Sequence, residues 1–314
     1  MNTKKVRKLK KSVKITIFII FIILIFIIFF VNYKKHTSTI SYKLGKLGYD
    51  KEEIETIKTL DHSKQEDILT KDYDKNIVEF LKEKYFIYDN LDRYIKYKKL
   101  NPKDKISDIV SLVNVNRDRD YYTEMNKTNI ELENLILVNK YYQLDKDFKF
   151  DDIVEVSNRH CYGEQSIRKE VYDKFIEMFN AAKLENLTII INSSYRPYDY
   201  QENLWNRYAR ENGEEWADKY AARAGSSEHQ TGLAIDVTTY NAKQQGDFEK
   251  TDEFTWMTNN AYKYGFILRY PKDKENITGY SYEPWHYRYV GKKVAEEIHN
   301  LGITYDEYYE YYLK

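Results

Sequence analysis

The hydrophobic residues of this chain follow two patterns, one continuous and one periodic. The continuous pattern is an apolar run from Ile15 to Val31, in which Thr16 is the only polar residue. Such a run approaches the ~20 residues that a helix needs to cross a bilayer, and it is longer than the usual apolar core of a signal peptide. We therefore predict a transmembrane signal anchor over residues 15–31.

The segments on either side of this run indicate how it is oriented across the membrane. Seven lysine and arginine residues lie between positions 4 and 14, and no small-residue cleavage motif follows the run, because Asn32-Tyr-Lys-Lys-His comes next. Basic flanks stay in the cytoplasm. The sequence predicts a single-pass protein of the cell membrane, with a cytoplasmic tail at residues 1–14 and the rest of the chain outside. A cleaved signal peptide and a buried core helix are the alternatives.

Helical periodicity dominates residues 32–134. Apolar residues recur at helical spacing in Ile54–Leu60, Ile77–Tyr85 and Ile106–Val113, and Asn101-Pro102 interrupts the pattern. We predict a helical stalk or small helical domain that holds the following domain away from the membrane. A module that binds the cell wall or a partner protein is the alternative, and no sequence repeat or metal-binding motif in this stretch favours it.

The remaining residues, 135–314, alternate between strand and helix patterns. Short apolar and β-branched runs predict strands at Leu187–Asn192, Leu233–Val237, Tyr264–Arg269 and Trp285–Val290. Amphipathic stretches predict helices at Ser166–Lys183, Asp199–Asn212, Glu214–Ala224, Thr251–Tyr264, Lys292–Asn300 and Tyr305–Leu313. This mixture predicts an α+β fold, with a small central antiparallel sheet flanked by helices.

Composition narrows the class of protein. Lys+Arg and Asp+Glu are balanced at 50 each, and the formal net charge is zero. Nucleic-acid-binding proteins normally carry a basic excess, so we expect no nucleic-acid partner. Cys161 is the only cysteine, which excludes an intramolecular disulfide and zinc–thiolate sites.

The segment Ser227-Glu-His229-Gln-Thr-Gly232-Leu-Ala-Ile-Asp236 concentrates side chains that can bind a metal. Gly232 and the apolar run after it predict a loop that enters a strand. A carboxylate on a buried strand is costly unless a cation or hydrogen-bond donors lie beside it. We therefore take His229 and Asp236 as candidate metal ligands.

A second segment, Glu283-Pro-Trp-His286-Tyr-Arg-Tyr-Val, adds an imidazole and a carboxylate. Together the two segments offer two histidines and one carboxylate as ligands, and one further carboxylate to move protons, as zinc hydrolases require. Either histidine alone would more often be an ordinary core residue. Strict strand alternation would place Glu283 and His286 on opposite faces, so the chain has to bend near Pro284 if both serve one site.

The pattern Ser-x-His-x-x-Gly-x-Ala-x-Asp, followed by Glu-Pro-Trp-His-x-Arg-Tyr-Val-Gly, resembles the zinc D-alanyl-D-alanine carboxypeptidase family that includes the VanY-type enzymes. Two further segments resemble it, Leu137-Val-Asn-Lys-Tyr-Tyr-Gln-Leu and Ser193-Ser-Tyr-Arg196-Pro with Gln201. The similarity spans about residues 135–291. It implies a zinc carboxypeptidase domain over 135–314, with the fold of the hedgehog and D-Ala-D-Ala-peptidase proteins.

The resemblance also implies the chemistry. By it, the Zn²⁺ ligands are His229, Asp236 and His286. Glu283 would be the catalytic base and Arg196 would polarise the scissile carbonyl. Ser227 and Gln201 are candidate substrate contacts, although each fits a turn or capping role equally well.

The implied reaction is removal of the C-terminal D-alanine from peptidoglycan stem peptides by metal-activated water. Two alternatives act on the same peptides, an L,D-carboxypeptidase and an endopeptidase. A catalytically silent wall-binding module is the third. The set of ligands and base argues against that module, because a silent protein has no need of a base beside the ligands.

A serine mechanism is a separate possibility. Ser166-Ile-Arg-Lys169 matches the Ser-x-x-Lys of penicillin-binding enzymes, which also release D-alanine but pass through an acyl-enzyme. That fold needs a Ser-Asp-Asn-like element and a Lys-Thr-Gly triplet as well. The sequence has neither, and its nearest triplet, Gln230-Thr-Gly232, lies inside the metal motif. We reject the serine mechanism.

Overall fold

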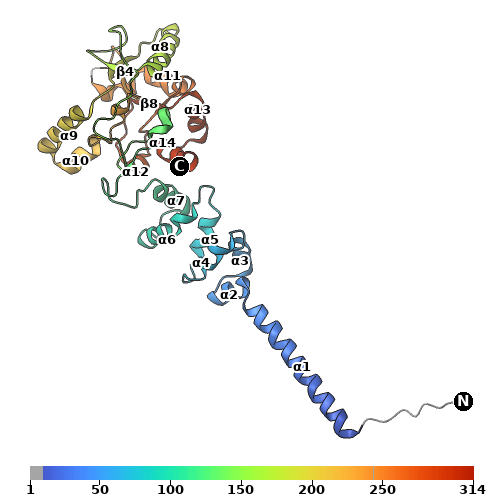
Figure 1. Cartoon of the computed structure of the whole chain (residues 1–314). Coiled ribbons are helices and arrows are strands. Elements are labelled where there is room, and N and C mark those ends of the chain that lie inside the picture. The colour runs from blue at the N-terminus through green and yellow to red at the C-terminus, as the bar shows by residue number, and fades with distance from the viewer. Residues whose placement is uncertain (1–9, 243) are drawn as a thin grey trace. The chain divides into compact units, whose positions relative to one another are not determined.

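The computed structural model describes residues 10–242 and 244–314, which form two compact units that divide between Phe86 and Ile87. The first unit begins with α1 (Lys11–Thr37), a helix of 27 residues (Figure 1). Its side chains from Ile15 to Val31 are exposed, and the helix is long and apolar enough to cross a membrane. The predicted apolar N-terminal helix is confirmed, whereas most of the basic tail predicted at 1–14 lies outside the described residues.

Four short helices complete the first unit: α2 (Ile40–Leu47), α3 (Lys51–Ile57), α4 (His62–Ile68) and α5 (Lys75–Leu81). Each begins at a Thr or Asp whose side chain accepts a hydrogen bond from the first turn, which satisfies a backbone N–H that the helix leaves free. One apolar residue or more from each helix is buried, among them Leu44, Ile57, Ile68 and Phe80. The helical prediction for this stretch is confirmed.

The second unit begins with η1 (Tyr88–Asn90), α6 (Leu91–Leu100) and α7 (Ile106–Asn114), and the interruption predicted at Asn101-Pro102 separates the last two helices. Arg93 of α6 donates to the backbone oxygen of Val113 at 2.8 Å, which ties α6 to α7. The two compact units divide at Phe86. The domain boundary inferred from the sequence, between residues 134 and 135, stays a prediction.

The centre of the second unit is a four-stranded antiparallel sheet in the order β5-β6-β8-β7. Its strands are β5 (Ile190–Ser193), β6 (Ala234–Thr238), β8 (His286–Tyr289) and β7 (Phe266–Leu268). The small antiparallel sheet predicted from the sequence is confirmed. Two smaller pairs lie outside it: β1 (Asn126–Lys127) with β2 (Tyr142–Gln143), and β3 (Ile153–Glu155) with β4 (Ser166–Arg168).

The helices around the sheet are α8 (Lys169–Leu184), α9 (Tyr198–Asn212), α10 (Glu214–Tyr220), α11 (Asp252–Asn260), α12 (Glu275–Thr278), α13 (Lys292–Leu301) and α14 (Tyr305–Tyr312). Four 3₁₀ segments connect them: η2 (Ile130–Leu135), η3 (Glu228–Thr231), η4 (Gln245–Lys250) and η5 (Ala261–Tyr264). Two predicted starts were wrong, since the strand expected from Leu187 begins at Ile190 and one helix also begins later. The helix expected from Ser166 begins at Lys169, because Ser166–Arg168 pair with β3 as a strand.

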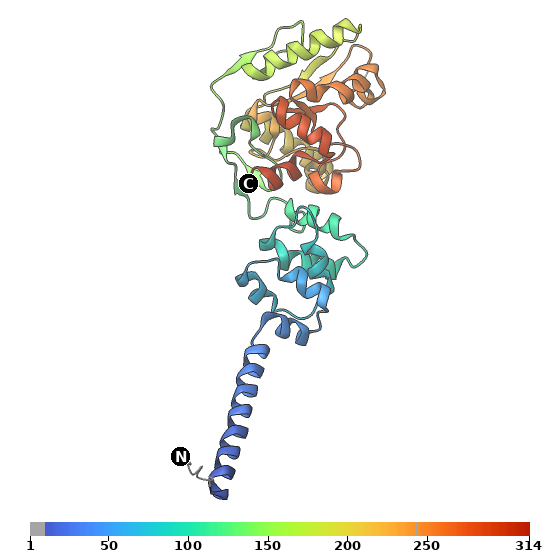
Figure 2. The same cartoon turned by 90° about the vertical axis from the view of Figure 1, so that its right-hand side faces the viewer.

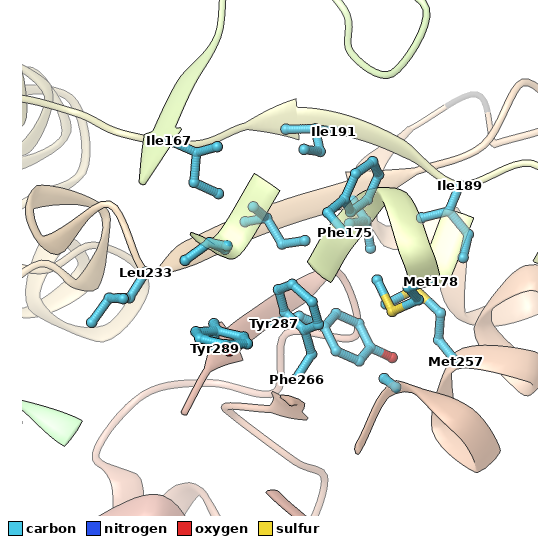
Figure 3. Packing of buried hydrophobic residues seen from close by; sticks show 14 of the residues in the cluster. Ile167, Phe175, Met178, Ile189, Ile191, Leu233, Met257, Phe266, Tyr287 and Tyr289 are labelled. Atoms are coloured by element: carbon cyan, nitrogen blue, oxygen red, sulfur yellow. The ribbon is translucent and has the colours of Figure 1, made fainter. Parts of the chain in front are cut away.

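The two faces of the sheet differ, because one is apolar and the other carries polar site residues beside a second apolar core. On one face, Ile235 and Val237 of β6 join the main hydrophobic core. Tyr287 of β8 and Phe175 and Met178 of α8 belong to the same core (Figure 3). The helices α13 and α14 lie apart from α8 in both views (Figures 1 and 2), and their apolar side chains pack with Ile267 in a second core. Since successive side chains of a strand alternate, Asp236 and His286 point away from the main core.

Candidate metal centre and catalytic cleft

The metal centre is built on the two central strands of the sheet. Asp236 of β6 and His286 of β8 are partners in the strand register. His229 comes from η3, and the chain passes from η3 into β6 through Gly232, whose φ is +65°. A Cβ at Gly232 would come within 2.7 Å of Ile153 Cδ1, the flexible end of a side chain that can shift, so the positive φ is the main reason for glycine there. The predicted loop entering a strand is confirmed.

These three side chains converge on one point. Asp236 Oδ1 lies 2.9 Å from His286 Nδ1 and 3.4 Å from His229 Nε2. The three candidate ligand atoms all lie within 4.8 Å of one another, and all three residues are buried. Two imidazoles and one carboxylate are a donor set that zinc hydrolases use, with the fourth position left for water or substrate.

The hydrogen bonds of the two imidazoles show whether each ring has a nitrogen free to bind a metal ion. Nδ1 of His229 lies 2.6 Å from the backbone oxygen of Ser194, so this nitrogen donates its proton and Nε2 turns a lone pair toward Asp236. Nε2 of His286 lies 3.3 Å from a Glu228 carboxylate oxygen, which leaves Nδ1 for the ion. Metal-binding histidines usually have their other nitrogen held in this way. The residues therefore fit a metal ion.

Burial and charge set the protonation of these groups. Burial lowers the pKa of His229 to about 4, and the charge of Arg196 acts in the same direction, so the ring is neutral as a ligand must be. Burial also opposes ionisation of Asp236, but His229 and His286 outweigh it and hold the pKa of that carboxyl well below its ordinary value. For His286, hydrogen bonds to Asp236 and Glu228 outweigh burial and raise the pKa to about 9. A metal ion therefore competes with a proton at His286.

Glu283 lies beside the three ligand residues. One of its carboxylate oxygens is 3.7 Å from His286 Nδ1. The backbone N–H of His286 donates to the backbone oxygen of Glu283 at 3.1 Å, which closes a turn at Pro284 and confirms the predicted bend. Burial raises the pKa of Glu283 to about 7, against the opposing effect of His286. A carboxyl with this pKa can both take and return a proton near neutral pH.

All seven predicted site residues line one cavity of about 280 Å³. They are Arg196, Gln201, Ser227, His229, Asp236, Glu283 and His286. Three residues that line it each have a buried polar atom with no hydrogen-bond partner among the described residues: Arg196 Nε, Gln201 Oε1 and Ser281 Oγ. Gln201 is held through its other end, because its Nε2 donates to the backbone oxygen of Ala222 at 2.8 Å. The protein itself therefore leaves these three polar atoms unpaired.

Sequence reasoning missed the rest of the cavity wall. Aromatic and small polar residues contribute to it, including Trp216, Tyr220, Tyr280, Ser281 and Tyr282. The only signal for Tyr280–Tyr282 was their position directly before Glu283, and the density of tyrosine elsewhere in the chain hides it. Sequence reasoning also missed Glu228, whose neighbours His229 and Ser227 were both singled out.

Comparison with known proteins decides the family. The profile for VanY, D-alanyl-D-alanine carboxypeptidase, matches residues 164–292. YodJ of Bacillus subtilis strain 168, which is named as a carboxypeptidase, is 44% identical over 182 residues, covering 56% of this chain and 67% of YodJ. The chain belongs to the VanY family of D-alanyl-D-alanine carboxypeptidases.

Two solved structures are similar to this chain. The LdcB LD-carboxypeptidase is 40% identical, with a TM-score of 0.57, and the match covers 60% of this chain and 91% of LdcB. A VanY D,D-pentapeptidase mutant in complex with Zn(II) is 32% identical, with a TM-score of 0.49, over 56% of this chain and 98% of that one. The predictions of a VanY-type zinc carboxypeptidase family and its α+β fold are confirmed. In this structure, His229, Asp236 and His286 form a site that can hold a metal ion.

Proposed function

We propose that this protein is a membrane-anchored zinc carboxypeptidase that removes the C-terminal D-alanine from peptidoglycan stem peptides. The observation that carries the proposal is the arrangement of the cleft. Three ligand residues, a carboxyl outside the ligand set and an arginine with a free buried nitrogen all face one cavity. This combination supports hydrolysis of a peptide bond rather than binding alone.

Each residue has a distinct task in this mechanism. A bound Zn²⁺ would supply Lewis acidity, which makes water a stronger nucleophile and the scissile carbonyl a better electrophile. Glu283 accepts a proton from the attacking water at its carboxylate and returns it to the amine of the leaving D-alanine. Arg196 donates hydrogen bonds toward the carbonyl oxygen, on which negative charge develops. Gln201 Oε1 accepts an N–H of the peptide, and Ser227 contacts the substrate close to His229.

The apolar sequence of α1 and its basic flank support a location in the cell membrane. We place residues 1–14 in the cytoplasm, residues 15–31 in the cell membrane and the remainder outside, where peptidoglycan lies. Residues 32–134 would then act as a helical spacer and residues 135–314 as the catalytic domain. Long apolar helices near an N-terminus also occur in cleaved signal sequences, and protease treatment of intact protoplasts distinguishes the two.

An L,D-carboxypeptidase is the second candidate, because LdcB is 40% identical to this chain. The two activities differ in the length of the substrate, so defined peptides separate them. We would incubate the full chain, purified in detergent, with a stem pentapeptide and a tetrapeptide, and identify products by mass. Release of one D-alanine from the pentapeptide is expected. Cleavage of the tetrapeptide alone would reject the D,D assignment in favour of the L,D one, and no cleavage of either would reject both.

A further inference from the structure

Glu228 is a fully buried glutamate next to the metal-binding residues. Its carboxylate divides its two oxygens between different partners. Oε2 lies 3.3 Å from Nε2 of His286, while Oε1 accepts hydrogen bonds from Arg269 Nε at 2.7 Å and Arg288 Nη1 at 2.9 Å. The side chains of Glu228 and both arginines are 0% exposed. A buried charge in such a place persists only when partners compensate it.

The two arginines are fixed from their far sides. Arg269 forms a bidentate ion pair with Asp306 of α14, at 2.5 and 3.1 Å. Asp306 Oδ1 also accepts a hydrogen bond from Asn139 Nδ2 at 2.8 Å. Arg288 donates to the backbone oxygen of Ile136 at 2.7 Å. The cluster thus pairs two guanidiniums with two carboxylates, and its charges balance within the protein interior.

This cluster joins the metal centre to parts of the fold that the family profile does not include. The profile matches residues 164–292, whereas Asn139 and Asp306 lie on either side of that range. The hydrogen bonds run without a break from His286 through Glu228 and Arg269 to Asp306 of α14. The C-terminal helix is therefore mechanically connected to a ligand of the metal.

We propose that Glu228 is a positioning residue for the metal centre. By accepting the Nε2 proton of His286, it holds the ring with Nδ1 toward the ion, and Arg269 and Asp306 extend this support to α14. A carboxylate behind a metal-binding imidazole fixes its tautomer and orientation and makes the ligand nitrogen more basic. Both oxygens of Glu228 are already occupied by His286 and the two arginines, so it acts on the metal centre through His286. The inference rests on the metal-dependent function proposed above.

Substitution of Glu228 by glutamine provides the test. Glutamine keeps the shape but has one acceptor oxygen, so either His286 or the arginine pair then faces an amide NH₂ group. For the Glu228→Gln variant of the full chain in detergent, we expect the Kd for Zn²⁺ to rise about 10- to 100-fold, measured by competition with a chromophoric chelator. The absorption spectrum of the Co²⁺-substituted protein should change as well, because the His286 ring is freer to turn.

Glu253 supplies a matched control. It is another buried glutamate of the same unit, and it accepts hydrogen bonds from Thr239 Oγ1 at 2.9 Å and from the backbone N–H of Thr188 at 3.2 Å. The Glu253→Gln variant should therefore bind Zn²⁺ as the parent does, although it also loses a buried carboxylate. A rise in the zinc Kd that is equal in both variants would show a general effect on folding and overturn the proposal.

Asp306→Asn provides a second, independent variant. Asp306 acts on the metal centre only through Arg269. We therefore expect Asp306→Asn to raise the zinc Kd by about 3- to 10-fold, which is less than the rise expected for Glu228→Gln. A folded Glu228→Gln protein with the parent's zinc Kd and cobalt spectrum would overturn the proposal. If Glu228→Gln does not fold, an unchanged zinc Kd in Asp306→Asn would do so. All these measurements omit substrate, so failure of the proposed carboxypeptidase activity would leave them intact.

Discussion

Nδ1 of His286 lies 2.9 Å from Oδ1 of Asp236, although fifty positions separate the two residues in the chain. They meet because β6 and β8 are neighbours in the sheet and these two residues are partners in its register. The opposite face of both strands is packed into the main hydrophobic core. The spacing of two metal ligands is therefore set by the pairing of strands, and removing the ion should leave the sheet in place.

Loss of either imidazole should abolish metal binding. We expect His229→Ala and His286→Ala to lose stoichiometric zinc, because two remaining ligands are too few for a stable site. Metal content by atomic emission measures this directly. His299→Ala is a suitable control, since the ring of His299 stacks on Tyr262 with centroids 3.8 Å apart and contributes nothing to the metal centre. A full equivalent of zinc in either ligand variant would contradict the assignment.

Substitution of Glu283 should have a different effect from substitution of a metal ligand. Glu283→Gln is expected to keep its zinc and lose about 10²- to 10⁴-fold in kcat/KM, because an amide of the same shape cannot take a proton. The assay is release of D-alanine from a stem peptide, with zinc content determined on the same sample. If the variant lost zinc and kept its rate with added metal, Glu283 would be a ligand rather than the base.

The pH dependence of the reaction should report Glu283. A base acts only when ionised, so kcat/KM should rise with pH through the pKa of this carboxyl and fall about tenfold per unit below it. Burial places that pKa at about 7 in the metal-free protein. A bound cation favours the carboxylate, so the midpoint is expected between the ordinary value of 4.5 and 7.

Zinc content has to be followed across the same pH series, because falling pH also protonates the histidine ligands and releases the ion. Rates are therefore compared only where the zinc content is constant. A rate that increased on acidification within that range would be incompatible with a carboxylate base.

Penicillin should not inhibit the enzyme. Lys169 forms an exposed ion pair with Asp173 at 2.7 Å, and Ser166 belongs to strand β4, so neither resembles an activated nucleophile and its base. We expect D-alanine release to continue with penicillin present, to stop with a zinc chelator and to return with added zinc. Ser166→Ala should change the rate little. Stoichiometric covalent labelling by penicillin, with resistance to chelation, would restore the serine mechanism.

The placement across the membrane can be tested with protease. If residues 15–31 form an uncleaved anchor, protease added to intact protoplasts should digest the chain beyond His36 and spare the short basic tail. Antibodies against each end would follow the two products. Mature protein that lacks residues 1–31 and appears in the medium would instead identify a cleaved signal peptide.

Local sequence patterns were enough to predict most of the helices and strands and all seven candidate site residues. The strands of the central sheet were visible as short apolar runs, and the seven site residues lie in compact motifs, so all of them reached one cavity. The strand Ser166–Arg168 was missed, because its pairing with β3 overrides a local pattern that also suits a helix. Glu228 was missed because its proposed role depends on hydrogen bonds to residues 41 to 60 positions away, and no local sequence pattern reveals such contacts.

The register of β6 and β8 also bears on how this site can change during evolution. One residue inserted in β6 between Ala234 and Asp236 would turn Asp236 to the opposite face of the sheet. One residue inserted between Glu283 and His286 would disrupt the turn that brings the base beside the ligands. The chain from Thr239 to Tyr282 connects the two strands, and its length does not affect how they pair. Insertions in this connection are therefore tolerated outside β7 and Arg269. Divergent lineages should therefore keep the spacing inside each motif while the distance between the motifs drifts.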